Sequence, residues 1–156
     1  KIIGGINRTS ILDDSYNASP AAMDAALSTL AAVETKGRKI AVLGDMMELG
    51  KHSTDEHKKT GALAAGICDM LVTVGMRAQT IAEEAHVKKM GKREILSFDD
   101  AREAGLALKG IVTEGDVILV KGSQSMRMER VVEELMAHPE DKRRLLVRQE
   151  TEWLER

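Results

Sequence analysis

The sequence predicts an α/β fold with a mostly parallel open sheet and helices on both faces. Short apolar segments alternate along the chain with longer segments of helical periodicity. Regular alternation of strands and helices is typical of a parallel sheet covered by helices. The length of 156 residues fits one domain, which can bury roughly two-thirds of its unfolded surface.

Apolar runs predict a short first strand and five longer ones. The strands are expected at Ile2–Ile3, Thr9–Asp13, Lys39–Gly44, Met70–Gly75, Glu94–Phe98 and Val117–Lys121. Amphipathic segments predict helices near Ala21–Glu34, Thr54–Cys68, Ala78–Lys89, Asp99–Val112 and Met126–Ala137. After Pro139 the chain is highly charged with a few apolar residues, which indicates a terminal helix docked on the body. We therefore expect one domain over 1–156, with an α/β body to about 138 and a C-terminal helical extension over 139–156.

Local signals define several boundaries. Ser19 is a capping residue before Pro20, which is suited to the first position of a helix. Ser53 and Glu56 have the spacing of a capping box, in which each side chain bonds the other residue's backbone. The Gly115-Asp116 pair indicates a turn into the last strand.

Composition excludes several classes of protein. A net charge of −2 argues against a nucleic-acid binder, which usually carries a basic excess. The single cysteine, Cys68, cannot form an internal disulfide, so we expect a cytoplasmic protein in which this thiol is buried and inert. No apolar run approaches the ~20 residues of a membrane span, and no signal peptide is expected. The chain starts at Lys1 without a methionine, so we expect a piece of a longer protein or a processed chain.

Polar residues follow three of the predicted strands. These segments are DDSYNASP at 13–20, LGDMMELG at 43–50 and VKGSQS at 120–125. Carboxyl ends of parallel strands share one edge of a sheet, where ligands bind in α/β proteins. The three segments therefore predict one common site.

Each segment has a functional and a purely structural interpretation. In the functional interpretation, Asp14 accepts the hydroxyls of a ribose and the Asn17 amide pairs with the edge of a heterocycle. In the structural interpretation, Asp14, Asn17 and Ser19 make only turn and cap hydrogen bonds. In the functional interpretation, Lys121 and the hydroxyls of Ser123 and Ser125 bind an anion at the helix start that follows them. In the structural interpretation, the lysine is only solvated.

The second segment combines acids and methionines. Asp45 and Glu48 could hold a cation or orient an amine, while Met46 and Met47 could instead fill the core. No metal site is expected, because these acids and the histidines at 52 and 57 lack tight ligand spacing, and solvated surface histidines are favoured. The chain has no P-loop motif, so it is not expected to cradle a triphosphate alone.

Together the three segments resemble the C-terminal domain of the Mur ligase family, in the branch that adds a dipeptide. The residues that carry the resemblance are 13–20 with Met23 and Ala25–Leu27, then 43–50, then 121–123, and finally Leu146–Gln149 near the end. The match runs in order over nearly the whole chain.

The resemblance implies a Rossmann-like domain of an ATP-dependent ligase for peptidoglycan precursors. Such an enzyme joins D-alanyl-D-alanine to UDP-N-acetylmuramoyl-tripeptide through an acyl phosphate. The resemblance also implies that ATP and Mg²⁺ are bound mainly by an absent central ATPase domain, which this domain contacts. No catalytic residue, nucleic-acid partner or membrane span is implied here, and the isolated domain is expected to be inactive.

The resemblance also implies roles for particular residues. Asp14, Tyr16 and Asn17 match the nucleotide-contacting loop. Lys121 and Ser123 match the strand end that faces the incoming dipeptide. Asp45 and Glu48 line the same cleft and are assigned to dipeptide binding.

The chain departs from the family pattern at two positions. Ser19 stands where the family has asparagine, and Gln124 stands where it has arginine, so a carboxylate contact is lost or passes to Arg127. Two alternatives are a receiver-type phospho-acceptor module, with Asp13-Asp14 and Lys121 in place, and a free-standing nucleotide-binding domain. Against the receiver alternative, this chain has Val74-Gly75 where a receiver would carry its acceptor aspartate.

Overall fold

The computed structural model describes residues 1–156, apart from the side chain of Arg93. The strands are β1 Ile2–Gly4, β2 Ser10–Asp14, β3 Lys39–Gly44, β4 Met70–Val74, β5 Ile95–Phe98 and β6 Val117–Lys121. The helices are α1 Pro20–Ala32, α2 Ser53–Ala65, α3 Ala78–Val87, α4 Ala101–Lys109, α5 Glu129–Leu135, α6 Lys142–Leu145 and α7 Thr151–Leu154. The α/β alternation is confirmed, and each predicted strand starts or ends within one residue of the observed strand.

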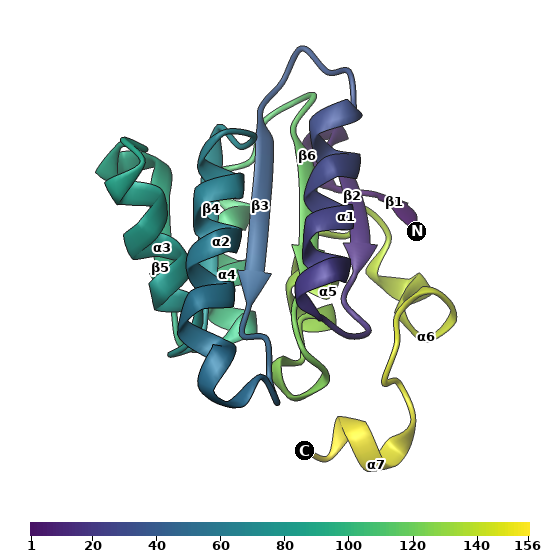
Figure 1. The fold of residues 1–156 in the computed structure, drawn as a ribbon. Helices are drawn as coiled ribbons and strands as arrows, with labels where there is room; N and C mark the ends of the chain where they lie inside the picture. Colours follow the sequence, from purple (N-terminus) through teal and green to yellow (C-terminus); the bar gives the residue numbers. More distant parts are fainter.

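The strands form one sheet in the order β1-β2-β6-β3-β4-β5 (Figure 1). Only the edge strand β1 is antiparallel to its neighbour, and the other pairings are parallel. The last strand, β6, lies between β2 and β3, where Lys121 is in register with Asp14 on one side and Leu43 on the other. Every residue of β4 and β6 is buried, which explains their continuous apolar runs.

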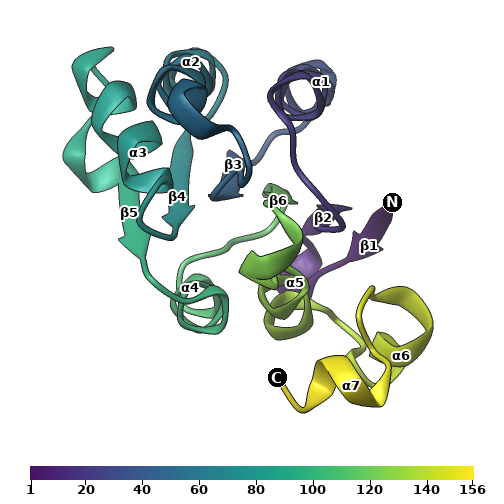
Figure 2. The same ribbon diagram turned by 60° about the horizontal axis from the view of Figure 1, so that its bottom comes forward.

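Two helical layers enclose the sheet (Figure 2). On one face, α1, α2 and α3 contribute to a core with Leu43 and Leu119, through Leu27 of α1, Ala64 of α2 and Ile81 of α3. On the other face, α4 and α5 contribute Leu108, Val131 and Leu135 to a core with Val42, Ile118 and Val120. Alternate residues of one strand therefore serve opposite cores, as the twofold periodicity of a strand requires.

The local signals have mixed outcomes. Ser19 caps α1 by accepting a hydrogen bond from the Ala22 N–H at 3.1 Å, with Pro20 in the first turn, and Gly115 turns with φ +87°. The capping box at Ser53 is wrong, because a 3-10 turn, η2 Gly50–His52, runs directly into α2 and leaves Ser53 helical at φ −55°.

The C-terminal segment is not one helix. After the 3-10 turn η5 Pro139–Asp141, it forms the two four-residue helices α6 and α7. Between them Leu146 and Glu150 have extended backbone, and Leu146 is buried in the core next to α5. The segment therefore runs along the body to the carboxyl edge of the sheet, where α7 lies (Figure 1). We call Leu146–Arg156 the tail.

Candidate functional site

The strand order creates a crevice at the carboxyl end of β6. The neighbouring strands β2 and β3 lead into α1 and α2 on one face, whereas β6 leads into α5 on the other. Adjacent connections therefore diverge, and ligands of open α/β sheets bind at such a point. The three polar segments that follow these strands meet here.

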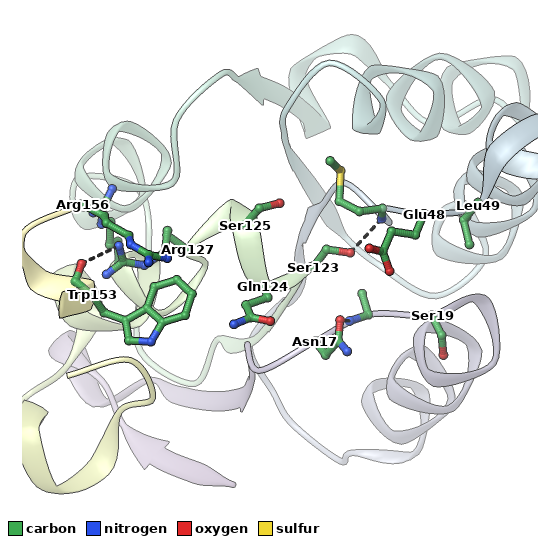
Figure 3. Close-up of a pocket in the computed structure, with 13 residues that line it drawn as sticks. Asn17, Ser19, Glu48, Leu49, Ser123, Gln124, Ser125, Arg127, Trp153 and Arg156 are labelled. Atoms are coloured by element: carbon green, nitrogen blue, oxygen red, sulfur yellow. Dashed lines mark hydrogen bonds between the residues drawn. The ribbon is translucent and has the colours of Figure 1, made fainter. Parts of the chain in front are cut away.

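A cavity of about 740 Å³ opens at this edge, within the range of small-molecule sites (Figure 3). All three strand-end segments contribute to it, and the tail forms a further wall. Its lining residues are Asn17, Ala18, Ser19, Met47, Glu48, Leu49, Ser123, Gln124, Ser125, Arg127, Arg130, Trp153 and Arg156.

The loop after β2 combines structural hydrogen bonds with free polar groups. Asn17 Oδ1 accepts the Ala18 N–H at 2.8 Å, while its amide nitrogen makes no hydrogen bond to any described group. Tyr16 is 68% exposed, and its ring does not line the cavity. Asp14 pairs with Lys121, with 2.8 Å between Oδ2 and Nζ. The cap and turn interpretation is therefore right for Ser19 and for the oxygen of Asn17, and the amide nitrogen remains available.

Lys121 is buried beneath this loop. Its side chain is 3% exposed, and Nζ donates to the Asn17 carbonyl at 2.8 Å as well as pairing with Asp14. The ammonium does not line the cavity. Lys121 therefore holds the β2 loop against the end of β6, which excludes the alternative of a merely solvated lysine.

The loop after β3 is fixed by both neighbouring elements. Asp45 is 4% exposed, and its Oδ1 accepts the Ala78 N–H at the start of α3 at 2.7 Å. The same carboxylate lies 3.6 Å from Arg77, so it faces α3 and does not line the cavity. Glu48, in contrast, is exposed and lines the cavity, with a left-handed backbone at φ +63°.

Met46 and His57 are part of the core. Met46 is fully buried, and its N–H donates to His57 Nε2 at 3.1 Å. His57 Nδ1 lies 2.6 Å from the Ser53 carbonyl, so the proton sits on Nδ1. The expectation of a solvated histidine at 57 is wrong, because this imidazole, 1% exposed, connects the β3 loop to α2. Cys68 is also buried, which confirms the predicted burial, and this burial raises the pKa of its thiol to about 12.

The loop after β6 lines the middle of the cavity. Ser123 donates its N–H to the Asp45 carbonyl at 2.9 Å, and its Oγ accepts the Met47 N–H at 2.8 Å. The loop continues as the 3-10 turn η4 Gln124–Met126. The expected helix start near Met126 is displaced to Glu129, because Arg127 has a left-handed backbone at φ 54°. An anion site formed by that helix start is therefore not observed, since the buried Glu129 carboxylate occupies the first turn.

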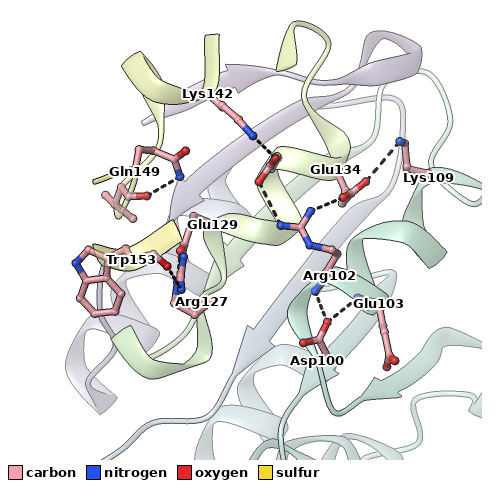
Figure 4. Close-up of polar contacts among 12 residues, drawn as sticks. Asp100, Arg102, Glu103, Lys109, Arg127, Glu129, Glu134, Lys142, Gln149 and Trp153 are labelled. Carbon is pink, nitrogen blue, oxygen red and sulfur yellow. Dashed lines mark hydrogen bonds and ion pairs between the residues drawn. The ribbon is translucent and has the colours of Figure 1, made fainter. Parts of the chain in front are cut away.

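The tail is attached through a buried Arg-Glu-Arg cluster, of which Figure 4 shows Arg127 with Glu129 and Trp153. Glu129, 1% exposed, accepts from Arg127 Nε at 2.6 Å and from Arg148 Nη2 at 2.9 Å. Arg148 also donates to the carbonyls of Ser15 and Tyr16, and Arg127 donates to the Trp153 carbonyl at 2.8 Å. One carboxylate thus connects the tail, α5 and the loop that carries Asn17.

Sequence patterns did not predict that Arg130, Trp153 and Arg156 line the cavity. Trp153 was assigned only to a docked helix, and the two arginines had no motif around them. One sequence feature could have indicated these residues. The single tryptophan is followed by an arginine three residues later, in a chain that is otherwise very poor in aromatic residues. Of the residues predicted for the site, Asn17, Glu48 and Ser123 line one cavity, whereas Asp14, Tyr16, Asp45 and Lys121 do not.

Comparisons with known proteins agree on one family. Residues 1–124 match the family described as Mur ligase, glutamate ligase domain. The UDP-N-acetylmuramoyl-tripeptide–D-alanyl-D-alanine ligase of Bacillus subtilis is 37% identical over 131 residues, covering 83% of this chain and 28% of that protein. The enzyme of the same name from Escherichia coli is 40% identical over 129 residues, covering 80% of this chain and 26% of that protein. The chain thus spans less than a third of these relatives.

Solved structures agree. The MurF ligase of Thermotoga maritima in complex with ADP has a TM-score of 0.69 and 29% identity, covering 86% of this chain and 29% of that one. MurF from Acinetobacter baumannii has a TM-score of 0.70 and 29% identity, covering 85% of this chain and 28% of that one. The family match decides against the receiver-module alternative. Among the described residues, no helix has the length and apolarity to cross a bilayer.

Proposed function

The chain belongs to the Mur ligase family, and we propose that it acts as the C-terminal domain of an ATP-dependent ligase for peptidoglycan precursors. The proposed reaction joins D-alanyl-D-alanine to UDP-N-acetylmuramoyl-tripeptide in the cytoplasm. ATP converts the terminal carboxylate of the tripeptide into an acyl phosphate, and the amine of the dipeptide displaces phosphate to form the peptide bond. The products are the pentapeptide, ADP and phosphate.

One observation carries the proposal: loops from β2, β3 and β6 converge on a cavity that is open at the carboxyl edge. An acyl phosphate is hydrolysed when water reaches it, so a domain that closes over a neighbouring site protects the intermediate. We propose that this edge faces a central ATPase domain outside the chain. The exposed ring of Tyr16 is then covered when the two domains close.

We assign the two sides of the edge to different substrates. Asp14, Tyr16 and Asn17 contact the nucleotide, supported by the free Asn17 amide nitrogen and the exposed phenol. Ser123 and Glu48 contact the dipeptide, supported by their position on the cavity wall.

Lys121 and Asp45 complete the proposed dipeptide site as positioning residues. Lys121 holds the Asn17 carbonyl, and Asp45 fixes the β3 loop to α3 and to the Ser123 N–H.

Mg²⁺ would stabilise the negative charge on the transferring phosphoryl group. Among the described residues, no three His, Cys, Asp or Glu side chains gather as ligands for a metal ion. We therefore assign Mg²⁺ to the central domain. The residues of this chain would orient the dipeptide and complete the nucleotide site.

Phosphate release from ATP tests the proposal. The longest natural polypeptide that contains this chain is expected to release phosphate only when both UDP-N-acetylmuramoyl-tripeptide and D-alanyl-D-alanine are present. The 156-residue chain alone is expected to release none. Turnover by the chain alone, or release by the longer protein that is independent of the dipeptide, would contradict the proposal.

Two substitutions separate the substrate assignments. Asn17→Ala is expected to raise the KM for ATP about tenfold, and Glu48→Gln the KM for the dipeptide by a similar factor, as the loss of one hydrogen bond of about 1 kcal/mol or slightly more predicts. Each variant should leave the other KM nearly unchanged. Equal changes in both constants would show that the two loops act as one structural unit.

A further inference from the structure

Three arginines gather at the tail end of the cavity, and the function proposed above does not use them. Arg127 and Arg130 come from the segment after β6, and Arg156 comes from the tail. A fourth arginine, Arg148, lies behind them in the buried cluster. The only carboxylate in that cluster is Glu129, whose two oxygens are already bonded to Arg127 and Arg148. The Asp100 carboxylate also acts on Arg130, so four guanidinium groups face two carboxylates and positive charge is in excess at this end of the cavity.

All three of the guanidinium groups that line the cavity have N–H donors that are not used within the described residues. The side chains of Arg130 and Arg156 form no hydrogen bond or ion pair with any described group, and Arg127 uses only Nε and Nη1. Burial and the nearby positive charges of Arg127 and Arg102 lower the pKa of Arg130. The guanidinium of Arg156 lies 4.7 Å from the centre of the Trp153 ring, and that of Arg127 lies 5.4 Å from it. Like charges gathered over one ring repel each other, and a bound anion would relieve that repulsion.

The opposite end of the cavity is acidic. Glu48 is exposed there, on the loop after β3, and neutral Ser123, Gln124 and Ser125 lie along the wall between the two ends (Figure 3). A cavity with a carboxylate at one end and guanidinium groups at the other matches a small zwitterion. A polyphosphate that filled the same space would meet the Glu48 carboxylate.

We propose that Arg130, Arg156 and the free edge of Arg127 bind the terminal carboxylate of the incoming dipeptide while Glu48 orients its amino group. This inference rests on the proposed function and assigns a direction to the dipeptide within that site. It also gives the tail a role in substrate recognition. Guanidinium groups suit the task because their planar donors match both oxygens of a carboxylate.

A substrate-analogue cycle tests this arrangement in the longest natural polypeptide that contains the chain. The two acceptors are D-alanyl-D-alanine and D-alanyl-D-alaninamide, which lacks the terminal charge. Phosphate release gives kcat/KM for each acceptor with the unaltered protein, Arg130→Gln, Arg156→Gln and the control Arg143→Gln. Arg143 carries the same charge on α6 and does not line the cavity.

The unaltered protein is expected to prefer the dipeptide over its amide. Arg130→Gln and Arg156→Gln should each reduce that preference about tenfold or more, since hydrogen bonds to charged groups contribute about 1.5–3 kcal/mol. The KM for ATP should stay within about twofold, and Arg143→Gln should match the unaltered protein. Activity with the amide is the internal check on folding, because loss of the carboxylate contact leaves that activity nearly unchanged.

Other results would overturn the inference. If the variants lose activity with both acceptors equally, the arginines only hold the tail in place. A rise in the KM for ATP with unchanged acceptor preference would assign the cluster to a nucleotide phosphate. If the unaltered protein does not use the dipeptide at all, the proposed function fails together with the inference. Failure of the inference alone appears as an active enzyme whose arginine variants keep the full preference.

Discussion

The amino and carboxyl edges of the sheet differ in how their buried carboxylates are paired with guanidinium groups. At the amino edge, beside β3 and β6, the Asp116 carboxylate accepts from Arg38 Nη2 at 2.8 Å and from the Thr113 N–H at 2.8 Å. One acid there meets one guanidinium. At the carboxyl edge, the Glu129 carboxylate meets both Arg127 and Arg148, and Arg130 and Arg156 add further charge nearby.

The amino edge is also packed more closely than the carboxyl edge. At the amino edge, Gly37 lies so close to the turn before β6 that an added Cβ atom would be 2.5 Å from the Asp116 nitrogen. The carboxyl edge leaves a cavity of about 740 Å³ between its loops, about twice the 380 Å³ of the hollow between Asn7 and Glu114 at the amino edge. Balanced charge with close packing indicates a structural role, and excess charge beside open space indicates binding. The following experiments test that contrast.

Removal of the buried Glu129 carboxylate at the carboxyl edge should cause the largest decrease in the free energy of unfolding. Glu129→Ala leaves Arg127 and Arg148 without their shared partner, and their side chains are 10% and 3% exposed. Breaking a buried ion pair costs about 3–5 kcal/mol, so we expect a decrease of this size in the free energy of unfolding. Urea denaturation followed by circular dichroism measures it. The control Glu114→Ala, which removes an exposed pair with Arg8, should change it by less than about 0.5 kcal/mol. Equal effects for the two variants would contradict the contrast.

Asp116→Asn should cost less, because its partner Arg38 is 35% exposed and remains partly hydrated. We expect about 1.5–3 kcal/mol at pH 7. Although burial raises the pKa of Asp116, hydrogen bonds from Arg38 and Thr113 outweigh it and lower that pKa below the ordinary value.

The lowered pKa predicts a pH dependence. The stabilisation from the Asp116 carboxylate is complete above the unfolded pKa of about 3.9, and it disappears as the pH falls through the lower folded value. Unfolding measured from pH 6 to pH 2 should therefore show the difference between the original protein and Asp116→Asn shrinking with acid. A difference that stays constant over this range would argue against a stabilising ionised carboxylate.

Gly37→Ala tests the close packing at the amino edge. The new methyl group would press against backbone atoms, which cannot rotate away, so we expect a loss of about 1–3 kcal/mol. Gly4→Ala is the matched control, since no heavy atom lies within 4 Å of its added Cβ. Urea denaturation should place the control close to the original protein. A tolerated alanine at 37 would show that the turn before β6 can move.

Trp153→Leu should have the weakest effect on global stability. The ring faces three guanidinium groups at 4.7–5.8 Å, and such contacts at exposed sites contribute about 0.5–1 kcal/mol. We expect faster amide exchange in α7 with little change in the sheet, because the tail opens locally. Hydrogen exchange resolved by residue measures both regions. Equal acceleration in β6 and α7 would show that the tail and the sheet unfold together.

Much of this molecule follows from local patterns. The continuous apolar run of β6 and the Ser19-Pro20 start of α1 were predicted within a residue or two, since strand burial and helix capping depend on neighbours in the chain. The convergence of the loops that carry Asn17, Glu48 and Lys121 also follows from the sequence, because the carboxyl ends of parallel strands must share one edge, although the Lys121 side chain does not line the cavity.

The pairing of charges did not follow from such patterns. Lys121 was expected to meet a ligand, yet its ammonium bonds the carbonyl of Asn17, 104 residues earlier in the chain. Arg148 reaches Ser15 and Tyr16 across more than 130 residues, and Glu129 is shared between two arginines. Hydropathy and residue type are readable along the chain, so the amino-acid order specifies the layers and the shared edge. The pairing of charged side chains, and the charges left free to bind a ligand, depend on distances between segments that are remote in the sequence. These distances are set only when β6 lies between β2 and β3 and the tail has docked.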